Sequence, residues 1–283
     1  MSVPPRQLLL TLQREMNSNS GWVRIHAAEA LLDHHHAQPV TRLLLREADT
    51  AQPPYRMGVW RVLARATGTA EERQMFIDRI RRAMLDPQAP DRVHAAESLA
   101  KLGAASPSDT PALLEWVAAA READAVYPLW LLALSGNSSV KADSEGRLGD
   151  LLESGDTIVR LRAAFALGRI TIVSPRSIGR LNQCLALEPE DSPVRAYAAS
   201  ALLRHAEENS SGATRLKQVL AEHLARGQPS EQLEAAIALG MRGTTEDLPV
   251  LARLADSPEA DARIGATSGS LYILEAGASL LSH

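Results

Sequence analysis

The segment Val-Arg-Leu-Arg-Ala-Ala-Phe-Ala-Leu-Gly at 159–168 decides the fold, because close copies of it recur along the chain. The copies are Val-Arg-Ile-His-Ala-Ala-Glu-Ala-Leu at 23–31, Arg-Val-His-Ala-Ala-Glu-Ser-Leu at 92–99 and Val-Arg-Ala-Tyr-Ala-Ala-Ser-Ala-Leu at 194–202. Weaker copies occupy 56–63, the region around 126–134, 232–240 and 263–269. Self-similarity at a near-constant period indicates a repeat architecture.

The repeat length predicts two helices in each unit. The Ala pairs follow one another at steps of roughly 31 to 37 residues, which accommodates two helices of about 12 to 15 residues and two short turns. The small Ala side chains let a paired helix approach closely, and the Leu that follows completes an apolar stripe. We predict an all-α solenoid of about eight antiparallel helix pairs. It forms a single domain over 1–283, with repeats at roughly 4–36, 37–67, 69–103, 109–136, 144–170, 174–206, 212–241 and 244–276.

Residues with capping chemistry stand at the expected helix ends. Asp91, Asp156 or a Ser-Pro pair precedes most second helices, where a side-chain oxygen can accept from exposed amides and Pro suits the first turn. Gly103, Gly168 and Gly240 fall near helix ends and predict left-handed caps. The stretch 135–146 is the least regular, and we expect a loop or a bend of the stack there.

The sequence Asp-Thr-Ile-Val-Arg-Leu-Arg-Ala-Ala-Phe-Ala-Leu-Gly at 156–168 resembles HEAT repeats, and most of all the short bacterial repeats named after phycobilin lyase subunits. The resemblance covers nearly the whole chain and implies a HEAT-like superhelix. It also implies a structural ladder in which recurring Asp and Arg side chains join neighbouring units. We carry that role onto Asp156, Arg160, Asp191, Arg195, Arg24, Arg92 and Arg263. Such repeats serve scaffolds, bilin lyases and DNA glycosylases, so the resemblance does not name a function.

Composition narrows the classes of function. The net charge of −4 lacks the basic balance of a nucleic-acid-binding protein, although a local basic patch stays open. No signal peptide and no membrane span is expected, so the cytoplasm is the default compartment. The run Asp33-His34-His35-His36 lacks zinc-ligand spacing, so we expect neither a metal site nor a cofactor.

Aromatic side chains occupy positions where the repeat has small residues. Trp60 and Trp130 fall at or beside the Ala-pair positions of repeats two and four, and Tyr55 and Tyr127 precede them. Two interpretations stay open. The indole rings either fill a locally wider core, which we favour, or project into a groove where they stack on a sugar, a base or a flat cofactor.

Ionisable side chains also depart from the repeat. His26, Glu29 and Asp33 share one helix face in repeat one, and His94, Glu97 and Lys101 repeat that spacing in repeat three. Repeat two presents Arg61 and Arg65 at the equivalent positions. We favour a salt-bridge ladder between stacked helices. The alternative is a groove that binds an anionic or sugar-like ligand and supports acid–base chemistry.

Three functions follow from these patterns. We favour a scaffold or adaptor that binds a protein or peptide along the concave face over any enzyme. The second hypothesis is a ligand-binding or lyase-like solenoid acting on a sugar or bilin-like ligand, with a site in repeats one to four. A DNA glycosylase ranks third, because the charge balance disfavours nucleic acid. The candidate catalytic residues are His26, His94 and Tyr55. The candidate binding residues are His26, Glu29, Tyr55, Arg56, Trp60, Arg61, His94, Glu97, Tyr127 and Trp130.

Overall fold

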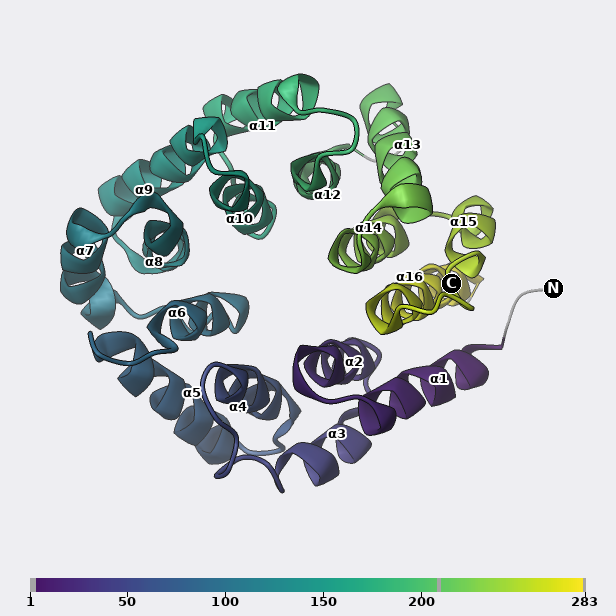
Figure 1. The fold of residues 1–283 in the computed structure, drawn as a ribbon, viewed down its shortest axis with the longest axis horizontal. Helices are drawn as coiled ribbons and strands as arrows, with labels where there is room; N and C mark the ends of the chain where they lie inside the picture. The colour runs from purple at the N-terminus through teal and green to yellow at the C-terminus, as the bar shows by residue number, and fades with distance from the viewer. Residues whose placement is uncertain (1–3, 208–209, 282–283) are drawn as a thin grey trace. The chain divides into compact units, whose positions relative to one another are not determined.

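The computed structural model describes residues 4–207 and 210–281, and over these ranges the chain is all-helical, without a strand. The predicted fold class is therefore confirmed: the protein is all-α, with its helices packed in neighbouring pairs (Figure 1). The α-helices are α1 (Pro5–Ser18), α2 (Gly21–Asp33), α3 (Ala37–Leu44), α4 (Tyr55–Ala66), α5 (Ala70–Leu85), α6 (Arg92–Lys101), α7 (Thr110–Ala119), α8 (Glu122–Ser135), α9 (Ser138–Asp150), α10 (Thr157–Leu167), α11 (Pro175–Leu187), α12 (Pro193–His205), α13 (Ser211–Arg226), α14 (Pro229–Arg242), α15 (Leu248–Ala252) and α16 (Ala260–Leu281). Short 3-10 turns at Pro107–Asp109, Leu151–Glu153 and Thr245–Asp247 join some of them.

The chain forms two compact units. Unit 1 comprises residues 1–36 and 184–283, and unit 2 comprises residues 37–183. In unit 2, helices α4, α6, α8 and α10 lie side by side in one layer, and α5, α7 and α9 form a second layer against them (Figure 1). In unit 1, α12, α14 and α16 follow the same order, with α13 packed on α12 and α14.

The Ala pairs lie at the core, as the repeat pattern requires. Ala95 and Ala96 on α6, and Ala163 and Ala164 on α10, have no exposed surface. Helix α10 starts at the predicted capping residue Asp156, which accepts from the amide of Ile158 at 2.8 Å. Asp91 precedes α6 but makes no side-chain capping bond, because its carboxylate accepts from Arg56. A small residue at each contact lets successive second helices pack closely, so the repeated segment builds the central layer of each unit.

The recurring Arg of the repeat ties the second helix to the end of the first helix of the same pair. Its guanidinium donates to backbone carbonyls that would otherwise lack a partner at the helix end. The bonds run from Arg24 to Met16 and Asn19, from Arg92 to Met84, from Arg160 to Ser154, from Arg195 to Leu185 and Glu188, and from Arg263 to Ser257 and Pro258. In the seventh pair the position holds Gln232, whose amide donates to the carbonyl of Leu224 at 3.1 Å.

These bonds lie within pairs, and the ladder between neighbouring repeats that the family resemblance implied stays a prediction. Asp156 caps its own helix, and Arg160 donates to the carbonyl of Ser154 in the same pair. Two repeat arginines also bond to another pair: Arg56 forms a two-point ion pair with Asp91, and Arg263 forms one with Glu15. The Arg residues of the repeat thus have a structural role, but chiefly within each pair.

Two local expectations are wrong. The loop expected at 135–146 is wrong, because the stretch lies largely within α9, whose start is capped by the side chain of Asn137 on the amide of Val140 at 3.0 Å. The alternative, a bend of the stack, stays a prediction. Gly103 has the predicted left-handed conformation, with φ of +59°. Gly168 does not, with φ of −63°, and Gly240 lies inside α14.

Gly240 instead permits a close helix crossing in unit 1. A Cβ atom built on Gly240 would lie 2.3 Å from the Cα of Gly269 on α16, and one on Gly269 would lie 2.4 Å from the carbonyl oxygen of Ala236. No side chain fits at either position without moving the backbone. The two helices therefore pack through their main chains at this point.

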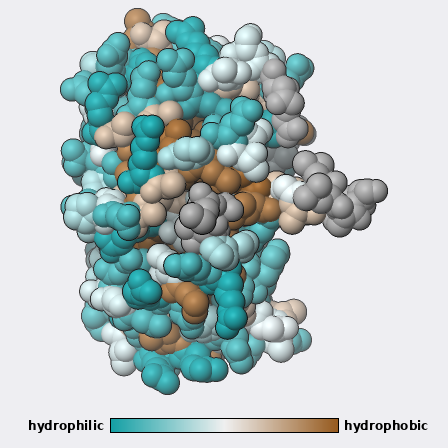
Figure 2. All heavy atoms as spheres, turned by 90° about the vertical axis from the view of Figure 1, so that its right-hand side faces the viewer, coloured by the Kyte–Doolittle hydropathy of each residue, from teal (hydrophilic) through white to brown (hydrophobic). Residues whose placement is uncertain are grey.

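The first and last helices of unit 1 also pack together. Helix α16 contacts both α1 and α2, and the contact is fastened by a two-point ion pair between Arg263 and Glu15. Figure 2 shows this side of the unit, where hydrophilic side chains dominate the periphery and apolar atoms gather near the middle. In the part of the chain that the structure describes, no helix combines the length and the apolar character needed to cross a membrane.

Candidate functional site

The sequence-predicted residues His26 and Glu29 lie on α2 in unit 1. The Nδ1 atom of His26 lies 2.9 Å from a carboxylate oxygen of Asp261, on α16. His26, a candidate catalytic residue, is therefore part of the contact between α2 and α16.

One cluster in unit 1 has the connectivity of a hydrolase triad. His34, just after α2, places Nδ1 2.9 Å from Glu275 and Nε2 3.1 Å from the hydroxyl of Ser268 on α16. A serine nucleophile needs this order of partners, but it must also reach a substrate. Ser268 has no exposed surface, and the ring of Tyr272 packs edge-on against His34 with centroids 4.7 Å apart. We therefore assign the cluster to helix packing.

The remaining predicted residues lie in unit 2, where they fall into two groups. One group lies on the layer of second helices: Arg61 on α4, His94 and Glu97 on α6, and Tyr127 and Trp130 on α8. The other group, Tyr55, Arg56 and Trp60, lies towards the start of α4.

The first group is part of a larger set of side chains that we call the basic face. Its partly exposed cations are Lys101 on α6 and Arg162 and Arg169 on α10 and just after it, and the imidazole of His94, the ring of Phe165 and the buried guanidinium of Arg61 on α4 lie with them. The residues from α6 and α10 occupy matching repeat positions, since His94 and Arg162 directly precede the Ala pairs and Lys101 and Arg169 follow seven residues later. Residues at this spacing share one side of a helix, so the two helices present equivalent side chains to the same side of the layer.

Side chains from α6 and α10 meet across α8. Lys101 pairs with Glu97 at 2.8 Å, and its ammonium also lies 5.0 Å from the ring centroid of Phe165. The guanidinium of Arg169 lies 3.4 Å from the same centroid. Phe165 in turn packs edge-on against Trp130, with centroids 5.9 Å apart. The cationic side chains are thus held on an aromatic platform rather than left mobile.

Trp130 belongs to the core of this platform. Only 1% of its surface is exposed, and the neighbouring Tyr127 is buried as well. The guanidinium of Arg162 covers Tyr127 at 5.5 Å and donates to the carbonyl of Ala123. Of the two interpretations of the aromatic substitutions, core filling describes Trp130.

The ionisable groups of the basic face shift one another's pKa values. Burial lowers the pKa of His94 below its usual value, and the nearby cations Arg162 and Arg61 lower it further, against the opposite influence of Glu97. Burial works to raise the pKa of Glu97, but Lys101 and Arg61 outweigh it and hold the pKa below the usual range. Glu97 is therefore ionised and His94 is neutral at neutral pH.

Two members of the second group, Arg56 and Trp60, line a pocket of about 370 Å³ at the start of α4, and Tyr55 does not. We call it the Trp60 pocket; its lining residues are Arg56, Trp60, Arg79, Arg82, Ala83, Asp86 and Ala89. The indole nitrogen of Trp60 donates to the carbonyl of Ala48 at 2.7 Å, which fixes the ring. Tyr55, the third candidate catalytic residue, donates its hydroxyl to Glu47 at 2.6 Å.

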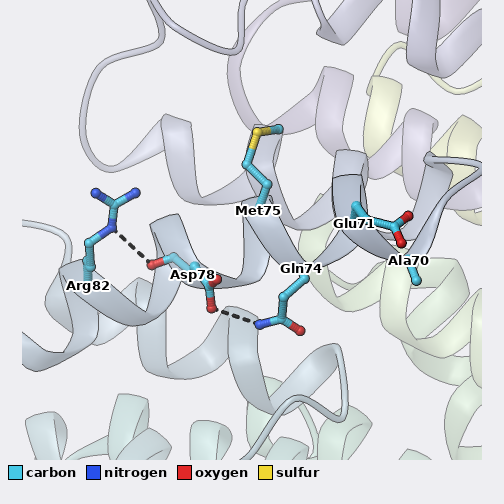
Figure 3. Close-up of a pocket in the computed structure, with 6 residues that line it drawn as sticks. All are labelled: Ala70, Glu71, Gln74, Met75, Asp78 and Arg82. Carbon is cyan, nitrogen blue, oxygen red and sulfur yellow. Dashed lines mark hydrogen bonds between the residues drawn. The ribbon is translucent and has the colours of Figure 1, made fainter.

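A second surface of α5 lies beside this pocket. Ala70, Glu71, Gln74, Met75, Asp78 and Arg82 line it, and all of them belong to one helix. Figure 3 shows Gln74 donating to the carboxylate of Asp78 and Arg82 donating to its backbone carbonyl, with Met75 projecting apart from them. Residues on one side of one helix do not enclose a ligand, so this surface is an open helix face.

Sequence reasoning missed residues of both the basic face and the Trp60 pocket. Arg162, Phe165 and Arg169 belong to repeat five, outside repeats one to four, where a site was expected. The register of the repeat could have identified them, because they stand where His94, Glu97 and Lys101 stand in repeat three. Arg79 and Arg82 lie on the first helix of a pair and carry no repeat signal.

Comparison with known proteins does not identify a family. No family model matches the sequence, and no curated protein matches it. Among solved structures, an engineered protein is similar over 93% of this chain and 77% of its own, with 19% identity and a TM-score of 0.38. The Escherichia coli protein YibA is similar over 94% of both chains, with 19% identity and a TM-score of 0.38.

Proposed function

We propose that the protein is an interaction module that binds an acidic segment of a partner protein along the basic face of unit 2. The observation that carries the proposal is the charge of this face. Three partly exposed cations, Lys101, Arg162 and Arg169, lie on this face, and the carboxylate of Glu97 is paired with Lys101 and also influenced by the buried Arg61. Complementary charge gives an interface its specificity and speeds association.

The contacts that order these cations support the proposal that they form a binding surface. Lys101 and Arg169 rest on Phe165, and Arg162 rests on Tyr127, so their side chains are already partly ordered. A partner that binds ordered side chains loses less conformational entropy on association. An acidic segment can therefore be bound without rearrangement of the helices beneath.

The aromatic rings favour a protein partner over nucleic acid. Proteins that bind single strands stack bases on exposed rings. Here Phe165 is engaged by two cations and Trp130 is buried. The face also has fewer cations than the six to ten phosphate contacts typical of a DNA-binding protein.

The contacts of the candidate catalytic residues favour binding over catalysis. His26 bonds to Asp261, Tyr55 bonds to Glu47, and the pKa of His94 is lowered mainly by burial. Each of these side chains has a structural partner or a buried setting. We therefore propose a binding protein and not an enzyme.

The test measures binding of a fluorescent polyglutamate peptide by anisotropy at low and at physiological ionic strength. The Lys101→Gln, Arg162→Gln double variant removes two cations of the basic face, and we expect it to weaken binding about tenfold. The control is Arg121→Gln, Arg176→Gln, which removes two exposed cations elsewhere in unit 2. Equal loss in both variants would show non-specific attraction and refute the proposal.

A second readout locates the bound peptide. The chain has three lysines, at 101, 141 and 217, so acetylation of lysine amines reports on few sites. Bound polyglutamate should protect Lys101 and leave the exposed Lys141 reactive. Protection of Lys141 alone, or tighter binding of a single-stranded oligonucleotide than of polyglutamate, would overturn the assignment of an acidic protein partner.

A further inference from the structure

We infer that the Trp60 pocket is a binding site for a phosphate monoester group, separate from the basic face. Three guanidinium groups, those of Arg56, Arg79 and Arg82, line a pocket of about 370 Å³ whose remaining charged lining residue is Asp86. The pocket has room for a phosphate group and part of the molecule that carries it.

The first two guanidinium groups are fixed in place. Arg56 donates Nε to Asp91 at 2.6 Å and Nη2 to the same carboxylate at 3.0 Å, and Asp91 has no exposed surface. The Arg56 guanidinium also lies 5.2 Å from the ring centroid of Trp60. Arg79 lies 5.8 Å from that centroid and pairs with Asp49 at 2.7 Å.

The guanidinium groups that line the pocket still have N–H donors for a ligand after these contacts. A guanidinium carries five N–H donors. Arg56 directs two to Asp91, and Arg79 directs one to Asp49, whose side chain is 80% exposed. Arg82 stands one turn after Arg79, is exposed, and donates to the carbonyl of Asp78 at 3.4 Å. The three side chains together can supply several donors to one tetrahedral oxyanion.

The number and the geometry of the guanidinium donors favour phosphate over carboxylate as the ligand. A guanidinium fork binds phosphate through two parallel hydrogen bonds, and a phosphate monoester carries close to two negative charges at neutral pH. Within the lining, three guanidinium groups face the single carboxylate of Asp86. The buried Asp91 and the largely exposed Asp49 balance Arg56 and Arg79 from outside the lining, so the match to a dianion rests on the guanidinium donors of the lining and not on a net positive charge of the whole cluster. The ring of Trp60 already has cations against it, so it serves as a platform for the arginines rather than for a base.

The indole N–H of Trp60 provides the reporter for the test. The chain has four tryptophans, so the indole region of a ¹⁵N-correlated NMR spectrum is simple, and Trp60→Phe assigns the signal. Phenyl phosphate, inorganic phosphate, a phosphoserine peptide and benzoate are titrated separately at fixed ionic strength. We expect the phosphate probes to shift the Trp60 signal to saturation and benzoate to bind at least tenfold more weakly.

Arg82→Gln is the diagnostic variant, because Arg82 is exposed and its removal leaves the ion pairs of Arg56 and Arg79 intact. It should weaken phenyl phosphate binding about tenfold. The control Arg176→Gln removes an exposed arginine of the same unit and should leave binding unchanged. Saturation by inorganic phosphate alone would point to the free ion, and tighter binding of an ester would point to a phosphorylated molecule. A linear, non-saturating shift, equal binding of benzoate, or wild-type affinity in Arg82→Gln would overturn the inference.

Discussion

Arg263 on α16 donates Nε to one carboxylate oxygen of Glu15 on α1 at 2.7 Å and Nη2 to the other at 2.8 Å, across 248 positions of the sequence. The Glu15 side chain is 8% exposed. A two-point bond of this kind is among the stronger interactions of a guanidinium. It joins the first helix of unit 1 to the last.

We expect the Glu15–Arg263 pair to make stability depend on pH in the acid range. The hydrogen bond from Arg263 lowers the pKa of Glu15 in the folded state, although burial opposes it. The stability that the ionised carboxylate provides is therefore complete above the pKa of the unfolded chain, about 4.5, and is lost as the pH falls through the folded value. Glu15→Gln should cost about 2 kcal/mol at neutral pH, and urea unfolding from about pH 7 to about pH 3 measures both effects.

The matched control is Glu222→Gln, which neutralises an exposed carboxylate of the same unit. It should change the free energy of unfolding by less than about 0.5 kcal/mol. If Glu15→Gln retains the acid sensitivity of the wild type, the pair does not contribute as described.

The close crossing of α14 and α16 at Gly240 predicts that a glycine-to-alanine substitution destabilises the protein there but not at an open position. Gly240→Ala places a methyl group 2.3 Å from the Cα of Gly269, and backbone must move to admit it. We expect a loss of about 1 to 3 kcal/mol or more. Gly146→Ala in α9 meets nothing within 4 Å, so higher helix propensity should leave stability unchanged or raise it by up to about 1 kcal/mol. Thermal unfolding of the two variants compares them directly, and a stabilised Gly240→Ala would contradict the close crossing.

The electrostatics of the basic face predict the titration of His94. Burial comes first and the cations Arg162 and Arg61 second in lowering its pKa. The unfolded chain binds the proton of this imidazole more readily than the folded protein. The free energy of unfolding therefore decreases as the pH falls below about 6.5 and His94 becomes protonated. Arg162→Gln should raise the pKa of His94, as measured by NMR titration of the imidazole signals, whereas Arg121→Gln should not. Bound polyglutamate should raise the pKa in the wild type, because it adds negative charge beside the ring.

The bonds from the repeat arginines to helix-end carbonyls, which we call the arginine clamp, predict that removing one such arginine lowers the free energy of unfolding. A sequence comparison would regard the position as an ordinary surface charge. Arg195 donates to the carbonyls of Leu185 and Glu188 at 2.7 and 3.3 Å. Arg195→Met keeps the apolar stem and removes both bonds, so we expect a loss of about 1.5 to 3 kcal/mol in urea unfolding. Arg226→Met, at the exposed end of α13, should change the free energy of unfolding by less than about 0.5 kcal/mol. Equal effects of the two would show that the clamp adds nothing.

The helices were predictable because their signal is local and repeated. An Ala pair, a capping residue and a following Leu lie within one helix, and each copy reinforces the others. The single-domain organisation and the HEAT-like superhelix stay predictions.

The site was less predictable because its contacts cross between helices. That Arg169 and Lys101 both rest on Phe165 depends on how closely α6 and α10 approach over α8, and the spacing within one helix does not contain this. Likewise the pairing of Glu15 with Arg263 joins residues that no repeat relates. Trp60 was recognised as a departure from the repeat and Arg56 as a candidate binding residue, but Arg79, whose guanidinium lies over Trp60, is on a helix whose pattern is ordinary.

The packing of α16 against α1 and α2 also bears on how such a chain can change during evolution. Repeat proteins ordinarily lengthen or shorten by gaining or losing units at an end, where one stacking surface faces solvent. Here α16 covers the surface of α1 and α2 on which a further unit would stack, and the bond between Arg263 and Glu15 fastens it there. Loss of α16 would therefore expose apolar surface of α1 and α2, so that within unit 1 substitutions of surface side chains cost less stability than changes in the number of helices.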